Sequence, residues 1–200
     1  MTMTEDRPAT AFATARRAMI DSQLRTSGVN EPWVLTAMAG IAREDYVPEG
    51  MRAAAYIDRA IALGEGRMLA APLVHGRMLA EAVPTAADKA LLVGDGNGYL
   101  AALLRPLVGT LDALSPAEAA SAQGAGSYSL VIIDGAIEEL PAGLSAQLAE
   151  NGRIVTGLAE RGVTRIATGR KAAGETALLP VADIGMPVLA EFAAPRRWSF

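Results

Sequence analysis

Three glycines, Gly94, Gly96 and Gly98, alternate directly after an apolar run over residues 90–93, and a helix-like run over residues 99–104 follows them. A strand ending in such a loop brings backbone N–H groups close to a ligand, because glycine has no Cβ and tolerates positive φ. Asp95 lies between the first two glycines. The pattern predicts a cofactor-binding loop, and the alternative is a joint in which the glycines serve only the turn.

Two carboxylates near this loop have both a ligand-binding and a structural interpretation. Asp95 is placed to cap the coming helix through backbone N–H groups. Asp134 closes an apolar run over residues 130–133, and the carboxyl end of a parallel strand faces the crevice in which α/β sheets bind ligands. Asp134 is therefore a candidate for a polar role in binding or catalysis, and capping of a following helix is the alternative.

Several other chemistries are excluded by the residues present. The chain has no cysteine, which excludes disulfides, thiol catalysis and thiolate metal sites. His75 is the one histidine and has no carboxylates at ligand spacing, so we predict no metal site and a packing or surface role for its ring. No Gly-x-Ser-x-Gly sequence supports a hydrolase.

Composition describes a globular protein rather than a disordered one, with 51% hydrophobic and 20% charged residues in a chain of 200. The net charge is −4 and the basic residues are scattered, so we expect no nucleic-acid partner, and Arg196 and Arg197 fit a solvated tail. The first residues lack the pattern of a signal peptide, and no stretch reaches the roughly 18–20 apolar residues of a membrane span. We expect a soluble, cytoplasmic protein without a membrane partner.

The elements that must position these residues change in kind near residue 84. After a flexible segment over residues 1–10, we predict helices over 11–25, 32–40, 48–56 and 72–82. Strands are then predicted over 91–93, 111–114, 130–133 and 153–156, with a helix over 141–150, and residues 163–167 and 176–181 favour a strand pair. This alternation is typical of an α/β protein with a parallel sheet. We predict one domain over residues 11–200, helical over 11–83 and sheet-forming over 84–200, preceded by the flexible N-terminus.

Three groups of residues resemble the protein-L-isoaspartate O-methyltransferase family: residues 19–25 with 28–29 and 34–38; residues 43–48 with 55–59 and 63–66; and the glycine loop with 142–144 and 147–155. The resemblance implies a class I methyltransferase fold, with a Rossmann-like sheet and a helical N-terminal extension. It also implies S-adenosylmethionine as cofactor and a protein or peptide partner, on which the methyl group goes to the free carboxylate of a damaged aspartate.

The departures from the family fall on the residues that would do this work. By this resemblance, Ala70 replaces the family's active-site serine and Ala71 replaces its glutamine. The resemblance also implies that Leu92 stands where the family has an acid. Ser115 stands where the family has a second acid, which accepts hydrogen bonds from both ribose hydroxyls of the cofactor. Asp112 takes that second role only if the register of its strand is slipped. The catalytic residue is therefore unassigned, and the predicted cofactor-binding residues are Gly94, Asp95, Gly96, Gly98 and Ser115.

The chain also looks too short for the family's third strand. The stretch from Tyr99 to Leu130 accommodates about one βαβ unit, which needs roughly 30 residues. In the family's strand numbering we therefore predict the order 2-1-4-5-7-6, with the second strand as an edge and one wall of the adenine pocket missing. Three hypotheses remain: a degenerate binding or regulatory relative whose methylation is weakened or lost, an active methyltransferase, and an altered pocket for another ligand.

Overall fold

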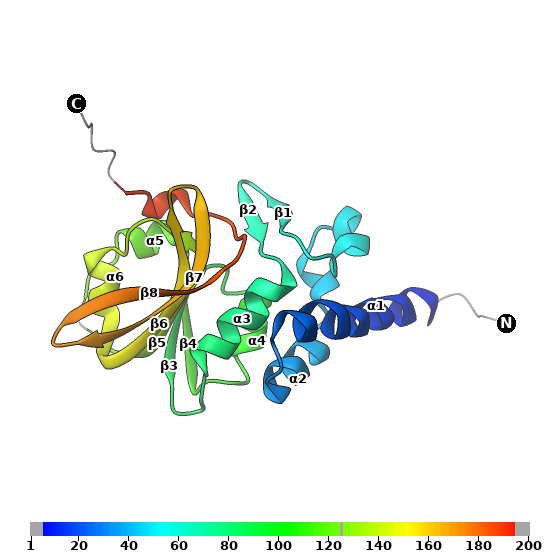
Figure 1. Cartoon of the computed structure of the whole chain (residues 1–200), viewed down its shortest axis with the longest axis horizontal. Helices are drawn as coiled ribbons and strands as arrows, with labels where there is room; N and C mark the ends of the chain where they lie inside the picture. The colour runs from blue at the N-terminus through cyan, green and yellow to red at the C-terminus, as the bar shows by residue number, and fades with distance from the viewer. Residues whose placement is uncertain (1–5, 125, 195–200) are drawn as a thin grey trace. The chain divides into compact units, whose positions relative to one another are not determined.

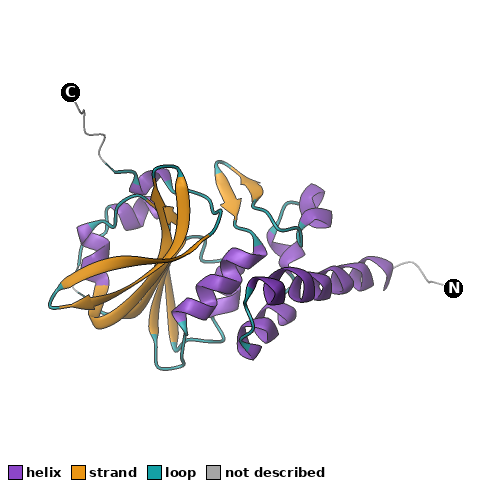
Figure 2. Ribbon diagram, in the orientation of Figure 1, coloured by secondary structure: helices purple, strands orange, loops and turns teal. Residues whose placement is uncertain are grey.

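Helices dominate the chain up to Ala80 and strands dominate it from Glu81 on, and two compact units divide at that point (Figures 1 and 2). The computed structural model describes residues 6–124 and 126–194. Residues 1–5 of the predicted flexible segment 1–10, together with Arg196 and Arg197, lie outside those ranges. Residues 6–10 are helical, because helix α1 begins at Asp6. The single domain expected over residues 11–200 stays a prediction.

The first unit is built from short helices and one small hairpin. Helix α1 (Asp6–Met19) continues into a π-helical turn (Ile20–Leu24) and a 3-10 turn (Arg25–Ser27), and Gly28 ends the run in the left-handed conformation with φ 85°. Helix α2 (Pro32–Gly40) and two 3-10 segments (Arg43–Tyr46 and Glu49–Ala54) follow. Strands β1 (Ile61–Gly64) and β2 (Arg67–Leu69) form the hairpin, and α3 (Pro72–Ala82) leads out of the unit. The helices predicted over 32–40 and 72–82 are confirmed.

The second unit is a six-stranded sheet in the order β4-β3-β5-β6-β7-β8. Its parallel part contains β3 (Lys89–Val93), β4 (Thr110–Leu114), β5 (Tyr128–Ile137) and β6 (Leu148–Glu160). Strands β7 (Val163–Ala172) and β8 (Glu175–Asp183) continue it antiparallel. The predicted α/β class with a Rossmann-like sheet is confirmed.

Short helices connect the parallel strands: α4 (Tyr99–Leu104), α5 (Pro116–Ala120) and α6 (Ala142–Gln147). Ala119 of α5 and Leu144 of α6 pack in one buried cluster with residues of β3, β5 and β6, so both helices cover the same face of the sheet (Figure 1). Phe192, from a 3-10 turn (Ala190–Phe192), completes this cluster. The helix predicted over 141–150 is too long, because β6 already begins at Leu148.

The predicted strand order is wrong at one end of the sheet. Only Arg161 and Gly162 separate β6 from β7, and their φ angles of 51° and 80° are both positive. Such a two-residue turn joins neighbouring antiparallel strands, so β7 pairs with β6 itself and β8 becomes the edge. In the family's numbering the order is therefore 2-1-4-5-6-7. At the other edge, β4 pairs only with β3, and no described residue between β4 and β5 forms a further strand, as predicted.

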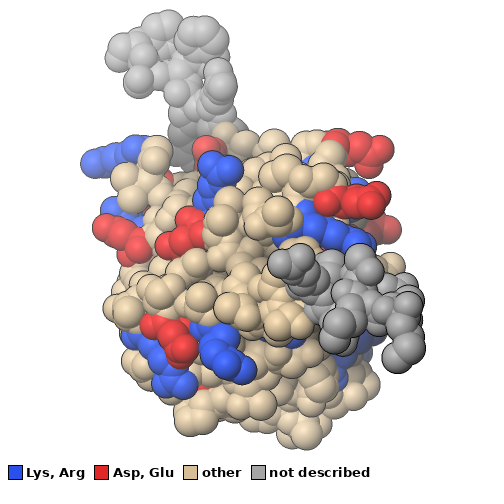
Figure 3. Space-filling view, turned by 90° about the vertical axis from the view of Figure 1, so that its right-hand side faces the viewer, with Lys and Arg blue, Asp and Glu red and all other residues tan. Residues whose placement is uncertain are grey.

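No helix within the described ranges is long and apolar enough to cross a membrane. Acidic and basic side chains are interspersed on the face drawn in Figure 3. The predictions on compartment and on nucleic-acid partners stay predictions.

Candidate functional site

The glycine loop continues directly from β3 and is shaped by its own backbone. The Gly94 N–H donates to the Leu114 carbonyl at 2.8 Å, extending the pairing of β3 with β4 by one step. Asp95 then accepts two hydrogen bonds, from the Asn97 N–H to its carboxylate and from the Gly98 N–H to its carbonyl, each at 2.9 Å. The N-cap of α4 is Gly98, without a side-chain hydrogen bond. The expectation that Asp95 caps this helix is therefore wrong, because its carboxylate is bound inside the loop.

Close packing explains why these positions are glycine. A Cβ on Gly96 would lie 2.9 Å from the Cβ of Ala113 on β4, closer than real Cβ atoms approach one another. A Cβ on Gly98 would lie 3.1 Å from both the Cβ and the carbonyl oxygen of Asp95. Arg105, at the end of α4, donates from Nη2 to the Gly96 carbonyl at 2.6 Å. The loop is thus narrow and braced from both sides.

Asp134 stands beside the first glycine. A Cβ on Gly94 would lie 3.1 Å from the Asp134 Cβ, so the two positions point to the same face of the sheet. Strand β5 continues beyond Asp134 to Ile137, and the next helix, α6, begins only at Ala142. The alternative of a helix-capping Asp134 is therefore wrong, since no helix starts there.

Ser115 follows β4 and caps α5. Its Oγ accepts from the Glu118 N–H at 3.3 Å, and the Glu118 carboxylate accepts from the Ser115 N–H at 2.8 Å and from its Oγ at 2.7 Å. These hydrogen bonds from Ser115 lower the pKa of the Glu118 carboxyl below its ordinary value. The Ser-x-x-Glu spacing is the sequence signature of a capping box, which the sequence analysis missed. The role predicted for Ser115 in cofactor binding stays a prediction. The structure places the Glu118 carboxylate next to Ser115.

Asp112 and Leu92 do not supply the acids that the family has. The pairing of Leu91 with Asp112 and of Val93 with Leu114 fixes the register of β4, so the slipped register that would bring Asp112 to the strand end is wrong. The Asp112 carboxylate instead accepts from the Tyr128 hydroxyl at 2.9 Å. Leu92 is fully buried in β3.

In the first unit, Ala70 and Ala71 form the joint between β2 and α3, and both are buried. The side chain of Arg43, also fully buried, holds this joint by donating from Nη2 to the Ala70 carbonyl and from Nε to the Ala55 carbonyl at 2.8 Å. Its Nη1 lies 3.2 Å from His75 Nδ1. Because a guanidinium only donates, Nδ1 is the acceptor and the His75 proton sits on Nε2. Of the two roles predicted for His75, packing or surface, the structure shows packing, because the ring is fully buried. Among the described residues no three His, Asp or Glu side chains gather as a metal ion would require, and the absence of a metal site stays a prediction.

A second group of polar side chains, Arg16, Glu44 and Tyr56, lies beside Arg43 and is joined by hydrogen bonds. The Tyr56 hydroxyl accepts from Arg16 Nε at 2.7 Å and from the Arg43 N–H at 3.2 Å, and donates to the Glu44 carboxylate. Arg16 pairs with Glu44 at 3.1 Å. Burial and the hydrogen bond to Glu44 raise the pKa of Tyr56 to about 12. Local sequence pattern does not reveal such contacts, although they involve residues of the stretches that carry the family resemblance.

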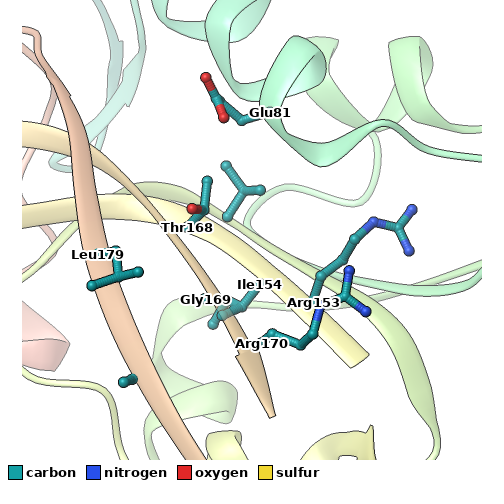
Figure 4. Close-up of a pocket in the computed structure, with 9 residues that line it drawn as sticks. Glu81, Arg153, Ile154, Thr168, Gly169, Arg170 and Leu179 are labelled. Carbon is teal, nitrogen blue, oxygen red and sulfur yellow. The ribbon is translucent and has the colours of Figure 1, made fainter. Parts of the chain in front are cut away.

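A cavity of about 410 Å³ lies elsewhere, on β6, β7 and β8, and its lining includes Glu81, Arg153, Thr168, Arg170 and Leu179 (Figure 4). Every side-chain nitrogen of Arg153 already donates to Asp88 or to the end of α3, and Arg170 donates to the Asn151 carbonyl. Arg153 therefore serves the fold, and the glycine loop remains the candidate cofactor site.

Comparison with known proteins agrees with this geometry. The model of the protein-L-isoaspartate(D-aspartate) O-methyltransferase family matches residues 14–115, just over half of the chain. The chain belongs to this family. The protein-L-isoaspartate O-methyltransferase of Koribacter versatilis is 33% identical over 190 residues, which cover 82% of this chain and 86% of that protein. Protein-L-isoaspartate O-methyltransferase 1 of Rhodopseudomonas palustris is 31% identical, covering 74% of this chain and 70% of its own.

A solved structure shares the fold of this family member. The putative protein-L-isoaspartate O-methyltransferase of Plasmodium falciparum, in complex with S-adenosyl-L-homocysteine, superposes with a TM-score of 0.67. The match covers 90% of this chain and 98% of that one at 18% identity. The likeness at this low identity confirms the methyltransferase fold.

Proposed function

We propose that this protein binds S-adenosylmethionine at its glycine loop and that its carboxyl methylation is weakened or lost, so that it serves as a binding or regulatory member of the family. The observation that carries the proposal is the alanine at position 70. In the family resemblance a serine hydroxyl stands at this position, beside the reacting carboxylate. Ala70 has no polar side-chain atom, and its carbonyl is already bound to Arg43.

The residues around the loop fit the chemistry of this cofactor. S-adenosylmethionine has ribose hydroxyls that can donate hydrogen bonds and, in its amino-acid moiety, an ammonium group, and carboxylates are suitable partners for both groups. Glu118 brings a carboxylate to the end of β4, and Asp134 places one beside Gly94 on β5. When bound, the cofactor supplies a methyl group already activated by its sulfonium. The chain itself then has only to hold the loop narrow and orient the acceptor, which is where most of the acceleration in such a transfer arises.

The size of the expected loss follows from one missing hydrogen bond. A hydrogen bond to a charged group contributes about 1.5–3 kcal/mol, and about 1.4 kcal/mol corresponds to a tenfold change in rate. Absence of the serine hydroxyl alone therefore slows methylation by about ten- to a hundredfold. The missing third strand adds to this loss by removing a wall of the adenine pocket.

The alternative, an active isoaspartyl carboxyl methyltransferase, is favoured by one observation. Arg43 holds the joint at Ala70 through buried contacts with Ala70, Ala55 and His75, so the backbone next to position 70 is fixed in spite of the changed side chain. A fixed backbone preserves orientation, and orientation is the larger part of the catalytic effect.

Calorimetric titration with S-adenosylmethionine and S-adenosylhomocysteine, followed by methylation of an isoaspartyl peptide, tests both proposals. Micromolar binding together with slow or undetectable methylation, raised at least tenfold in Ala70→Ser but not in the neighbouring control Ala71→Ser, supports the first. The alternative is supported if the wild-type protein methylates the peptide as fast as active relatives measured alongside and Ala70→Ser does not change that rate. Absence of binding by folded protein contradicts both.

A further inference from the structure

Asp134 lies at the point where the connections of the sheet change direction. From β3 the chain passes to β4 on one side, and β5 then lies on the other side of β3. In open α/β sheets, ligands bind in the crevice outside the carboxyl ends of the strands at such a switch point. Gly94 follows the last residue of β3, and Asp134 follows the paired residue Ile133 on β5, so both stand at this point.

The side chain of Asp134 lies on the same face of the sheet as Leu92, the position on β3 where the family resemblance expects an acid. In the parallel register Leu92 pairs with Ile132, and paired residues of neighbouring strands point to the same face. Leu92, Gly94 and Asp134 therefore share a face, as the short distances from a Cβ on Gly94 to both side chains show. A carboxylate absent from β3 is thus present one strand away, beside the first glycine.

The strand order gives the direction in which an adenosyl ligand would lie. Glu118, twenty positions after Gly98, brings its carboxylate to the end of β4, and in nucleotide-binding sheets an acid about this far after the glycines binds the ribose. With the nucleoside over β4 and the loop over β3, the other end of the ligand reaches β5. Asp95 lies within the loop itself, where its carboxylate accepts from the Asn97 N–H, whereas Asp134 lies on the strand toward which that end of the ligand extends.

On this basis, and resting on the proposed binding of S-adenosylmethionine, we propose that the Asp134 carboxylate binds the ammonium group of the cofactor's amino-acid moiety. The half-buried position of Asp134 favours this pairing, because a carboxylate withdrawn from water gains more from a cation than an exposed one does. Asp134 is then a cofactor-binding residue contributed by β5.

Calorimetry with three ligands tests the assignment on the full chain. S-adenosylmethionine and S-adenosylhomocysteine both contain the ammonium group, and 5′-methylthioadenosine lacks the whole amino-acid moiety. We expect Asp134→Asn to weaken binding of the first two by about ten- to a hundredfold and to leave binding of the third unchanged. Unchanged binding of the third ligand also shows that the variant is folded. Asp112→Asn, which changes an exposed carboxylate on β4, is the matched control and leaves all three affinities unchanged.

The other outcomes separate the inference from the proposed function. Wild-type affinity of Asp134→Asn for all three ligands overturns the inference alone. Equal weakening of all three overturns it too, since the effect would then not depend on the amino-acid moiety. Weakening confined to S-adenosylmethionine assigns the carboxylate to the sulfonium instead and rejects the ammonium. If the folded wild-type protein binds neither cofactor form, the proposed function fails and the inference fails with it.

Discussion

Arg153 and Asp88 form a two-point ion pair, with Arg153 Nη2 and Nη1 lying 2.6 and 2.9 Å from the two carboxylate oxygens of Asp88. The Asp88 side chain is only 5% exposed. Arg153 also donates from Nε to the Ala82 carbonyl and from Nη2 to the Val83 carbonyl, so the same guanidinium fixes the end of α3. One arginine of β6 thereby connects Asp88, the residue before β3, with the end of α3.

Removing this arginine should destabilise the protein strongly. Arg153→Met keeps the length of the side chain but leaves a buried carboxylate without its cation, which costs about 3–5 kcal/mol. Urea unfolding measures the loss. Arg165→Met is a suitable control, because its partners Glu160 and Asp183 are exposed and such pairs contribute about 0–1 kcal/mol. If the two substitutions lower the free energy of unfolding equally, the buried Arg153–Asp88 pair contributes no more to stability than an exposed pair does.

The same pair predicts how stability changes in acid. Burial by itself raises the pKa of Asp88, but hydrogen bonds from Arg153, Ser129 and the Thr85 N–H outweigh it and hold the pKa well below its usual range. A carboxyl with a lowered folded-state pKa contributes stability above its unfolded pKa, about 3.9, and loses it as the pH falls further. We expect the free energy of unfolding of the wild type to fall below pH 4 more steeply than that of Asp88→Asn. Parallel curves would contradict the assignment.

Tyr56 predicts a change at the opposite end of the pH scale. Burial and the hydrogen bond to Glu44 raise its pKa to about 12, above the ordinary value of about 10. The neutral phenol is thus favoured in the folded state, and its contribution is complete below pH 10 and lost as the pH rises toward 12. The stability of the wild type should fall between pH 10 and 12 with a component that is absent in Tyr56→Phe. Chemical unfolding across this range in both proteins measures the difference.

The parts of the fold that follow from local pattern were predictable. Apolar runs between turns indicated β3, β4, β5 and β6, and the glycine spacing indicated the loop. The order of the last strands was also within reach, because Arg161 and Gly162 leave room for nothing but a tight hairpin. The strand order was nevertheless predicted wrongly from the family pattern.

The contacts that hold the joint at Ala70 were not predictable in the same way. Arg43 meets His75 and Ala70 across about thirty intervening positions, and no local period records such a distance. A buried arginine is also rare enough that sequence alone favours an exposed one. Ser115 differs from these, since its capping box with Glu118 is a local pattern and could have been recognised.

Val83 offers a substitution that should stabilise the protein. It follows α3 with φ 42°, a left-handed conformation that is costly for a β-branched residue, and its side chain is 56% exposed. Val83→Gly removes this strain at a small cost in unfolded-state entropy, for a net gain of up to about 1 kcal/mol. Thermal and urea unfolding should show the gain, and Val83→Ala, which keeps a Cβ, should show less of it. A loss in the glycine variant would mean that the Val83 side chain contributes more than its exposure indicates.

Gly96 and Ala113 form a matched pair that separates packing from ligand binding. A Cβ on Gly96 would lie 2.9 Å from that of Ala113, so Gly96→Ala must displace the loop or β4, with an expected cost of about 1–3 kcal/mol. Ala113→Gly removes the opposing methyl, and the double variant should recover stability beyond the sum of the single changes. Urea unfolding of the four proteins gives this coupling. Calorimetry with S-adenosylhomocysteine on the double variant then tests the loop itself. If affinity recovers together with stability, only packing requires glycine at this position. If affinity is still lost in a stable protein, the ligand approaches Gly96 directly.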